Sequence, residues 1–123
     1  MYSPVVLDHF GNPRNVGDPG GLRIVGLSGD PNAGPFMRIF LVVRDGLIQR
    51  ACFETYGCIA AIAAGSLVTE WIAGMPVAEA SLITTRELLN KLGGLPLGKE
   101  NCAALAVEAL GKALFAREVR GEE

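Results

Sequence analysis

The sequence predicts an α+β fold, in which a three-stranded antiparallel sheet carries helices on one of its faces. Two observations support this prediction. Apolar residues recur at every second position in much of residues 22–56, the period of half-buried strands, and they recur at helical spacing after residue 57. The chain has 123 residues and shows no repeat or linker that divides it, so we expect a single domain over residues 1–123.

The predicted strands follow a short N-terminal helix and a loop rich in glycine and proline, which together take up residues 1–21. Residues 22–27 form the first strand. Residues 36–44 form the second, with one apolar face made of Met37, Ile39, Leu41 and Val43. Asp45-Gly46 favours a type I′ hairpin turn, because glycine adopts a positive φ freely. Residues 47–56 should therefore return antiparallel to the second strand.

The third strand departs from simple alternation. Ile48, Ala51 and Phe53 all have the character of core residues, yet positions 48 and 51 differ in parity. An extra residue near Gln49 and Arg50, forming a β-bulge, would bring all three to one face. Residues 28–35 contain turn-forming residues and little to bury, so they form a loop between the first two strands.

Helical patterns begin after Gly57. Residues 58–73 are rich in alanine, and Gly74 is suited to end that helix. Thr84 with Glu87 three residues later forms a capping box, which opens a helix running to Gly93-Gly94. In the last helix the residues at helical spacing are Cys102, Leu105, Ala106, Ala109, Ala113 and Leu114. We expect this helix to cover the sheet face that carries Met37, Ile39 and Leu41.

Composition excludes several classes of function. The formal net charge is -2 at pH 7 and the basic residues are scattered, which argues against nucleic-acid binding. The longest apolar runs are far shorter than the roughly 20 residues of a membrane span. No signal peptide is recognisable, so we expect a cytoplasmic protein. The glycine pairs lack the spacing of a phosphate-binding loop, and a hydrolytic triad cannot be assembled around the single histidine, His9.

The three cysteines are the residues best suited to chemistry. An odd number of cysteines without a secretory signal indicates reduced thiols. Cys58 and Cys102 are each predicted in the first turn of a helix, where backbone N–H groups and the helix dipole favour a thiolate. They are candidate ligands or nucleophiles, with burial as small apolar residues the alternative. Cys52 faces away from the core side of its strand and is interpreted as incidental, and His9 is placed outside the site.

Three blocks of sequence, in order along the chain, carry a family signature. The first comprises Tyr2-Ser3, Leu7-Asp8-His9-Phe10 and Asn12-Pro13-Arg14-Asn15-Val16-Gly17. The second comprises Phe53-Glu54-Thr55-Tyr56-Gly57-Cys58, Ala60-Ala61-Ile62-Ala63 and Thr69-Glu70-Trp71-Ile72-Ala73-Gly74. The third comprises Leu95-Pro96, Lys99, Cys102 and Leu105-Ala106. In these blocks the chain resembles the U-type iron-sulfur cluster scaffold family, also known as the IscU or NifU N-terminal domain family.

The resemblance implies a SufE/NifU-like fold and a role as an iron-sulfur cluster assembly scaffold or carrier, not an enzyme. Family members hold iron or a nascent [2Fe-2S] cluster through three cysteines and an aspartate or histidine. Cys58 matches the second family cysteine. Cys102 matches the third, which also accepts persulfide sulfur from a cysteine desulfurase. Ala33, Pro35 and Asn101 stand where the family has its first cysteine, its aspartate and its histidine.

The resemblance therefore leaves the ligand set incomplete. A [2Fe-2S] cluster needs four protein ligands, and Cys58 and Cys102 supply two. Asp30, Glu100 or Asn101 could supply oxygen ligands, or a homodimer could share one cluster through four cysteines. Two thiolates would also hold zinc incompletely. The chaperone-recognition segment of the family is half preserved, as Leu95-Pro96-Leu97-Gly98-Lys99.

Two alternative functions stay open. One is a sulfur-accepting or regulatory paralogue that binds the desulfurase without holding a cluster. The other is thiol redox chemistry, with Cys58 and Cys102 forming a reversible disulfide.

Overall fold

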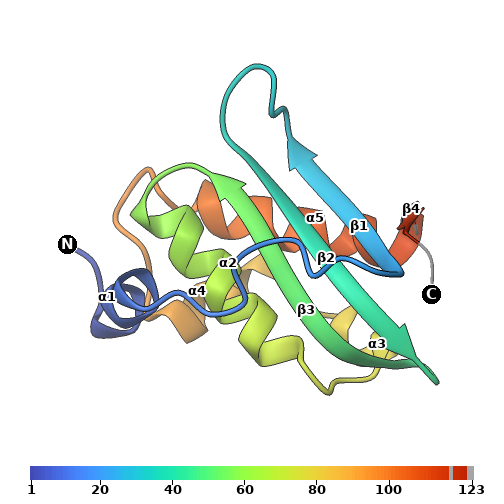
Figure 1. The fold of residues 1–123 in the computed structure, drawn as a ribbon. Coiled ribbons are helices and arrows are strands. Elements are labelled where there is room, and N and C mark those ends of the chain that lie inside the picture. Colours follow the sequence, from blue (N-terminus) through green and yellow to red (C-terminus); the bar gives the residue numbers. More distant parts are fainter. Residues whose placement is uncertain (117, 122–123) are drawn as a thin grey trace.

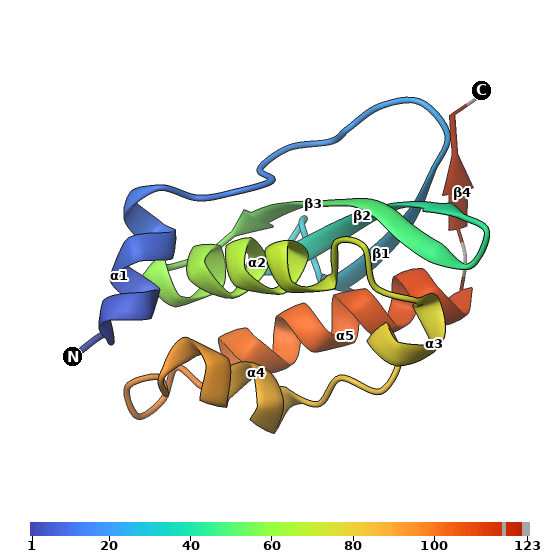
Figure 2. The same cartoon turned by 90° about the horizontal axis from the view of Figure 1, so that it is seen from below.

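A computed structural model describes residues 1–116 and 118–121 of the chain. The elements in order are α1 (Pro4–Gly11), β1 (Arg23–Gly29), β2 (Phe36–Arg44), β3 (Leu47–Tyr56), α2 (Ile59–Ile72), α3 (Val77–Ala80), α4 (Thr85–Leu92), α5 (Asn101–Ala116) and β4 (Glu118–Arg120) (Figure 1). The strands form an antiparallel sheet, and α2 and α5 lie on one face of it (Figure 2). The predicted α+β class is confirmed.

Within the described residues the sheet has four strands, in the order β3-β2-β1-β4, and not the three that were predicted. The additional strand, β4, pairs antiparallel with β1, with Val119 opposite Ile24. It was missed because it has only three residues, two of them charged, and so presents no apolar period. None of the helices in the described part of the chain has both the length and the apolar composition to cross a bilayer.

The hairpin between β2 and β3 confirms both local predictions made for it. Asp45 and Gly46 have φ angles of 55° and 74°, as a type I′ turn requires. The pairing register shifts between Val42, opposite Arg50, and Val43, opposite Ile48. Gln49 is therefore the extra residue, and the bulge turns Ile48 to the same buried face as Phe53.

The sheet face opposite the helices is crossed by the segment after α1 (Figure 2). This segment is tied to the β3 edge where the N–H of Phe53 donates to Asn15 O at 2.9 Å and the N–H of Gly17 donates to Phe53 O at 2.8 Å. On this face Cys52 packs with Val25 and Phe40 in a small cluster and is only 2% exposed. Cys52 therefore faces away from the helices, as predicted, but it serves as a buried packing residue.

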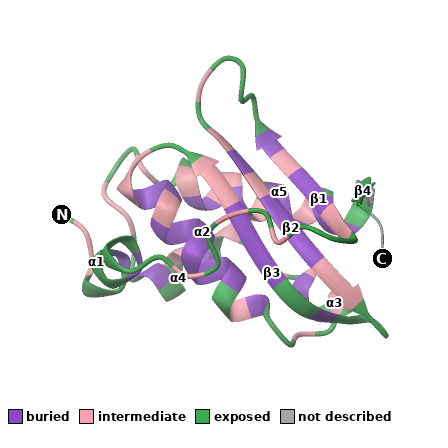
Figure 3. Ribbon diagram, in the orientation of Figure 1, coloured by how far each residue is buried: buried purple, intermediate pink, exposed green. Residues whose placement is uncertain are grey.

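The main core lies between the sheet and the helices (Figure 3). Met37, Ile39 and Leu41 are fully buried there, which confirms the face predicted to lie under the last helix. On α5 the prediction was less accurate, because Leu105 is only partly buried whereas Leu110 is fully buried. The difference arises because α5 packs against α2 and α4 as well as against the sheet.

Two glycines let the helices approach the sheet unusually closely. A Cβ atom placed on Gly26 of β1 would lie 2.1 Å from the backbone oxygen of Ala109 and 2.3 Å from the backbone nitrogen of Ala113, both in α5. A Cβ placed on Gly65 of α2 would lie 2.4 Å from the Phe53 ring on β3. Any larger residue at these two positions would push a helix away from the sheet.

We predict that Gly26→Ala destabilises the protein by about 1 to 3 kcal/mol, the usual cost of overpacking, because the obstacle is helix backbone and cannot rotate away. Gly111→Ala is the matched control, since Gly111 lies within α5 and a Cβ there would meet no atom within 4 Å. The control should be stabilised by roughly 0.5 to 1 kcal/mol. Urea unfolding measures both values, and equal midpoints for Gly26→Ala and the wild type would contradict the prediction.

His9 holds α1 against α2 and lies outside the cysteine site, as predicted. Its Nδ1 atom is 2.7 Å from the hydroxyl oxygen of Ser66, which also accepts the backbone N–H of Arg14 at 2.9 Å. The Ser66 hydroxyl therefore bridges His9 and the backbone of Arg14, and the Nε2 side of the ring faces Glu70 at 3.8 Å. Because Ser66 is 0% exposed, no substrate can reach it, and the pair is structural.

The pKa of His9 lies below its usual value, first because of burial and then because of the charge of Arg14, with Glu70 and Asp8 opposing. As the pH falls, the unfolded chain therefore takes up the proton before the folded one does. The contribution of His9 to stability is complete above about pH 6.5 and declines as the pH falls from there toward the pKa of the folded state.

We predict that the wild type loses more unfolding free energy than His9→Asn between about pH 7 and pH 5.5. The asparagine amide can bond Ser66 from the Nδ1 position but does not titrate. Urea unfolding at each pH gives the two slopes, and the carboxylates common to both chains cancel in the comparison. Parallel slopes would contradict this role of His9.

Candidate functional site

Cys58 and Cys102 meet at one end of the helical layer, with their sulfur atoms 3.7 Å apart. Cys58 is the N-cap residue of α2 and has an extended backbone, directly after β3 and Gly57. Cys102 lies in the first turn of α5. Because α2 and α5 run side by side on the same sheet face, the starts of both helices reach the same place (Figure 2).

The surrounding contacts fix this end of the fold. The Ser28 hydroxyl on β1 donates to the carbonyl oxygen of Leu105 at 2.6 Å, which fastens the first turns of α5 to the sheet. The Thr55 hydroxyl on β3 donates to Phe36 O at 2.7 Å and joins the two strands that lead into the site. The two cysteines are therefore held by separate elements that the sheet connects.

Both cysteines are half-buried and open into a hollow of about 410 Å³. Its lining comes from three parts of the chain: the end of the loop before β2, the start of α2, and the loop leading into α5. The lining residues are Pro35, Gly57, Cys58, Ala61, Gly98, Lys99, Asn101, Cys102 and Leu105. Among the described residues of this lining, Lys99 alone is charged.

The predicted oxygen donors differ in their position relative to the hollow. Asn101 lines the hollow, whereas Asp30 does not. The Asp30 carboxylate accepts the backbone N–H of Asn32 at 2.9 Å and so closes its own turn. The Glu100 carboxylate accepts the N–H groups of Gly98 and Lys99. Among the described residues no three His, Cys, Asp or Glu side chains gather around one point, so ligand roles for Asp30 and Asn101 remain predictions.

The two thiols differ in acidity. Desolvation raises the pKa of Cys58, but the backbone N–H groups of Ala61 and Ala60, the Cys102 thiol and Lys99 together outweigh it, so that the pKa falls below its usual value. For Cys102, desolvation and the neighbouring Cys58 sulfur raise the pKa to about 11. The expectation that a helix start favours the thiolate therefore holds for Cys58 and is wrong for Cys102. Of the two thiols, Cys58 is therefore the one that ionises more readily.

The spacing of the pair suits a shared metal ion. Two thiolates bound at about 2.3 Å in a tetrahedral arrangement lie about 3.8 Å apart. The observed 3.7 Å requires almost no rearrangement. The pair provides half of a four-ligand shell, and Lys99 adds positive charge that stabilises an anionic group in the hollow.

We predict that iodoacetamide labels Cys58 at lower pH than Cys102, because the thiolate is the reactive form. Cys52 should react slowest, since it is buried. Lys99→Met should move labelling of both site cysteines to higher pH by removing the nearby positive charge. Initial rates for each peptide, followed by mass spectrometry across a pH series, measure the order. Labelling of Cys102 ahead of Cys58 would contradict the assignment.

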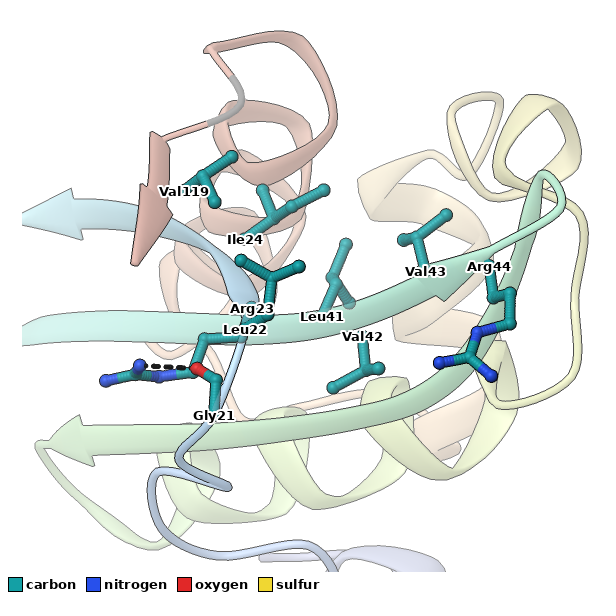
Figure 4. A pocket seen from close by; sticks show the side chains of 9 residues that line it. All are labelled: Gly21, Leu22, Arg23, Ile24, Leu41, Val42, Val43, Arg44 and Val119. Atoms are coloured by element: carbon teal, nitrogen blue, oxygen red, sulfur yellow. Dashed lines mark hydrogen bonds between the residues drawn. The ribbon is translucent and has the colours of Figure 1, made fainter. Parts of the chain in front are cut away.

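A second, larger hollow of about 610 Å³ lies at the far end of the sheet (Figure 4). It is lined by residues 21–24, residues 41–44 and Val119. Strand β2 connects the two hollows, since Pro35 before it lines the first and Arg44 at its end lines the second. The lining of the second hollow is aliphatic apart from Arg23 and Arg44, and Arg23 is paired with Asp18. Among the described residues that line it there is no nucleophile or metal ligand.

Lys99 lines the cysteine site, although sequence reasoning placed it only in the third family block and in the chaperone-recognition segment. The signal available was its position, three residues before Cys102, in the loop that leads into the helix. A basic residue there lies beside the helix start, where an anionic sulfur or cargo would sit. Its direction into the hollow depends on the turn at Gly98, which has a φ of 87°.

The fold and the paired thiols define a small α+β protein with an open two-cysteine site at one end of its helical layer. The family model described as the NifU-like N terminal domain matches residues 1–122, and the chain belongs to this family. The chain is 45% identical over 114 residues to the iron-sulfur cluster assembly scaffold protein IscU 1 of Archaeoglobus fulgidus, covering 93% of this chain and 74% of that protein.

A second relative and a solved structure are also similar to this chain. The iron-sulfur cluster assembly scaffold protein IscU of Escherichia coli (strain K12) is 42% identical over 117 residues, which cover 92% of this chain and 91% of that protein. Among solved structures, a nitrogen-fixing NifU-like protein (N-terminal) from Brucella abortus superposes with a TM-score of 0.66 at 17% identity, covering 91% of this chain and 90% of that one. This last likeness concerns the fold alone.

Proposed function

We propose that this chain is an iron-sulfur cluster assembly scaffold that takes up iron and sulfur as cargo at Cys58 and Cys102. The observation that carries the proposal is the pair of sulfur atoms, 3.7 Å apart at the edge of an open hollow. Membership of the NifU-like family and the names of the relatives support it. We expect the protein to act in the cytoplasm as a carrier and not as an enzyme.

Sulfur is accepted at Cys102 from the persulfide of a cysteine desulfurase. Cys102 is mainly protonated near neutral pH, and Cys58 lies close enough to take its proton. Cys58 then acts as the base while the Cys102 sulfur attacks the sulfane sulfur of the donor. This proton transfer to Cys58 replaces the expectation that the helix dipole activates Cys102.

Two ligand positions remain to be filled when a [2Fe-2S] cluster or an iron ion binds. Asn101 and Asp30 are the oxygen donors proposed within one chain, and Cys58 and Cys102 of a second copy are the alternative in a homodimer. We further propose that a chaperone docks on the Leu95-Pro96-Leu97-Gly98-Lys99 segment, where Leu97 is 96% exposed. This segment leads directly into the hollow.

The test is anaerobic reconstitution with ferrous iron and sulfide, read out by absorption spectrum and by iron and sulfide content. Cys58→Ser and Cys102→Ser should each lower bound iron at least about tenfold, since soft thiolate ligands are lost. Cys52→Ser is the matched control and should bind as the wild type does, because Cys52 lies in a separate cluster. Equal binding by all three variants would contradict the site.

Restoring family ligands provides a second test. Ala33→Cys combined with Pro35→Asp should raise the bound iron and sulfide per chain, because Pro35 already lines the hollow and the added groups complete the shell. The ratio of iron to chain, with the mass of the complex, separates a single-chain site from a shared one. No gain in a protein that remains folded would contradict a scaffold role for this loop.

A further inference from the structure

We infer that the cysteine pair also releases sulfide, by using Cys58 to reduce sulfane sulfur that has been loaded on Cys102. The inference rests on the proposed function for its sulfur donor and adds an activity to the same site. It follows from the contact between the Cys58 thiol at the start of α2 and the Cys102 thiol at the start of α5.

The two sulfur atoms are already within the distance range from which an attack can begin. The Sγ atoms of Cys58 and Cys102 are 3.7 Å apart, close to the contact distance of two sulfur atoms and near the separation of about 3 to 3.5 Å at which positioned groups react. A disulfide has a sulfur-sulfur bond of about 2.05 Å, so an approach of roughly 1.7 Å suffices. Rotation of the two half-buried side chains can supply this movement.

A persulfide on Cys102 offers two sulfur atoms to Cys58. The outer, sulfane sulfur extends into the hollow of about 410 Å³, where Lys99 can stabilise its negative charge. The inner sulfur is Cys102 Sγ itself, the atom already in contact with Cys58. Attack on the outer atom would only move the sulfane sulfur to Cys58, whereas attack on the inner atom expels it. The existing contact favours the inner atom.

The step balances without an added oxidant. Cys58 passes its proton to the terminal sulfur of the Cys102 persulfide, and the Cys58 thiolate attacks Cys102 Sγ. The Cys58–Cys102 bond forms, the bond from Cys102 Sγ to the sulfane sulfur breaks, and hydrosulfide leaves with the electron pair and the proton. The sulfane sulfur is reduced by two electrons and the two cysteines are oxidised to a disulfide. A dithiol reductant then returns the pair to its thiol form.

The experiment loads the reduced full-length protein with a limited amount of inorganic polysulfide under anaerobic conditions, without desulfurase, iron or added thiol. Excess polysulfide is removed, and hydrosulfide and intact mass are followed over time. The wild type should lose the mass of one bound sulfur atom and of two hydrogen atoms. It should release about one hydrosulfide for each disulfide formed.

Cys58→Ser is the decisive variant. It should keep the added sulfur on Cys102 and release hydrosulfide at least about tenfold more slowly than the wild type. Cys52→Ser should behave as the wild type, which controls for the loss of a cysteine elsewhere. A tandem mass spectrum should locate the wild-type disulfide between Cys58 and Cys102, and a far-UV spectrum establishes that each variant is folded.

Three results would overturn the inference: a stable persulfide on wild-type Cys102, equal hydrosulfide release from Cys58→Ser, or a protein that takes up no sulfur. The first two results are separate from a failure of the proposed function, whereas a chain that takes up no sulfur contradicts both. A chain that binds iron and sulfide on reconstitution but keeps its persulfide contradicts only this inference. A chain that forms the disulfide but never holds iron contradicts only the scaffold proposal.

Discussion

The approach of α5 to β1 at Gly26 is the constraint on which the rest of the site depends. At this point helix backbone lies where any side chain on the strand would have to be, and the contact fixes the height of α5 above the sheet. Gly65 does the same for α2 over Phe53. With both helices held at the surface of one sheet, their first turns are brought together, and the sulfur atoms of Cys58 and Cys102 come into contact. The many small residues of both helices allow this close approach to the sheet.

Close contact also explains why two helix starts do not give two similar thiolates. The dipole and free N–H groups of a helix start favour an anion, but a second anion at 3.7 Å would be repelled strongly in a half-buried site. The contact therefore separates the two acidities, with the pKa of Cys58 below its usual value and the pKa of Cys102 raised to about 11. This arrangement gives each cysteine a different task. One can serve as a base or attacking group, and the other can receive sulfur once its proton has moved.

The sequence was informative where the determinants are local. The alternation of Met37, Ile39 and Leu41, the positive-φ turn at Asp45-Gly46 and the capping box at Thr84 are set by neighbouring residues, and the structure confirms each of them. The bulge at Gln49 followed from a conflict of parity, which is also local. Strand β4 could not be predicted because its three residues gain their order from pairing with β1. The burial of Leu110 and the raised pKa of Cys102 likewise depend on elements distant in sequence. The residue pattern of α5 alone therefore could not predict them.

The order in which cargo arrives would decide what the site does. A metal ion bound to both sulfurs needs the second proton removed, and its charge supplies the means to lower the pKa of Cys102. Cys58 is then a ligand and can no longer attack its neighbour, so sulfur delivered afterwards stays as a persulfide or becomes part of a cluster. Under the inferred step, sulfur that arrives at a metal-free pair would meet a free Cys58 in contact with Cys102 Sγ, and it would leave as hydrosulfide. The same 3.7 Å contact thus supports either holding sulfur or releasing it, and occupancy by metal selects between the two.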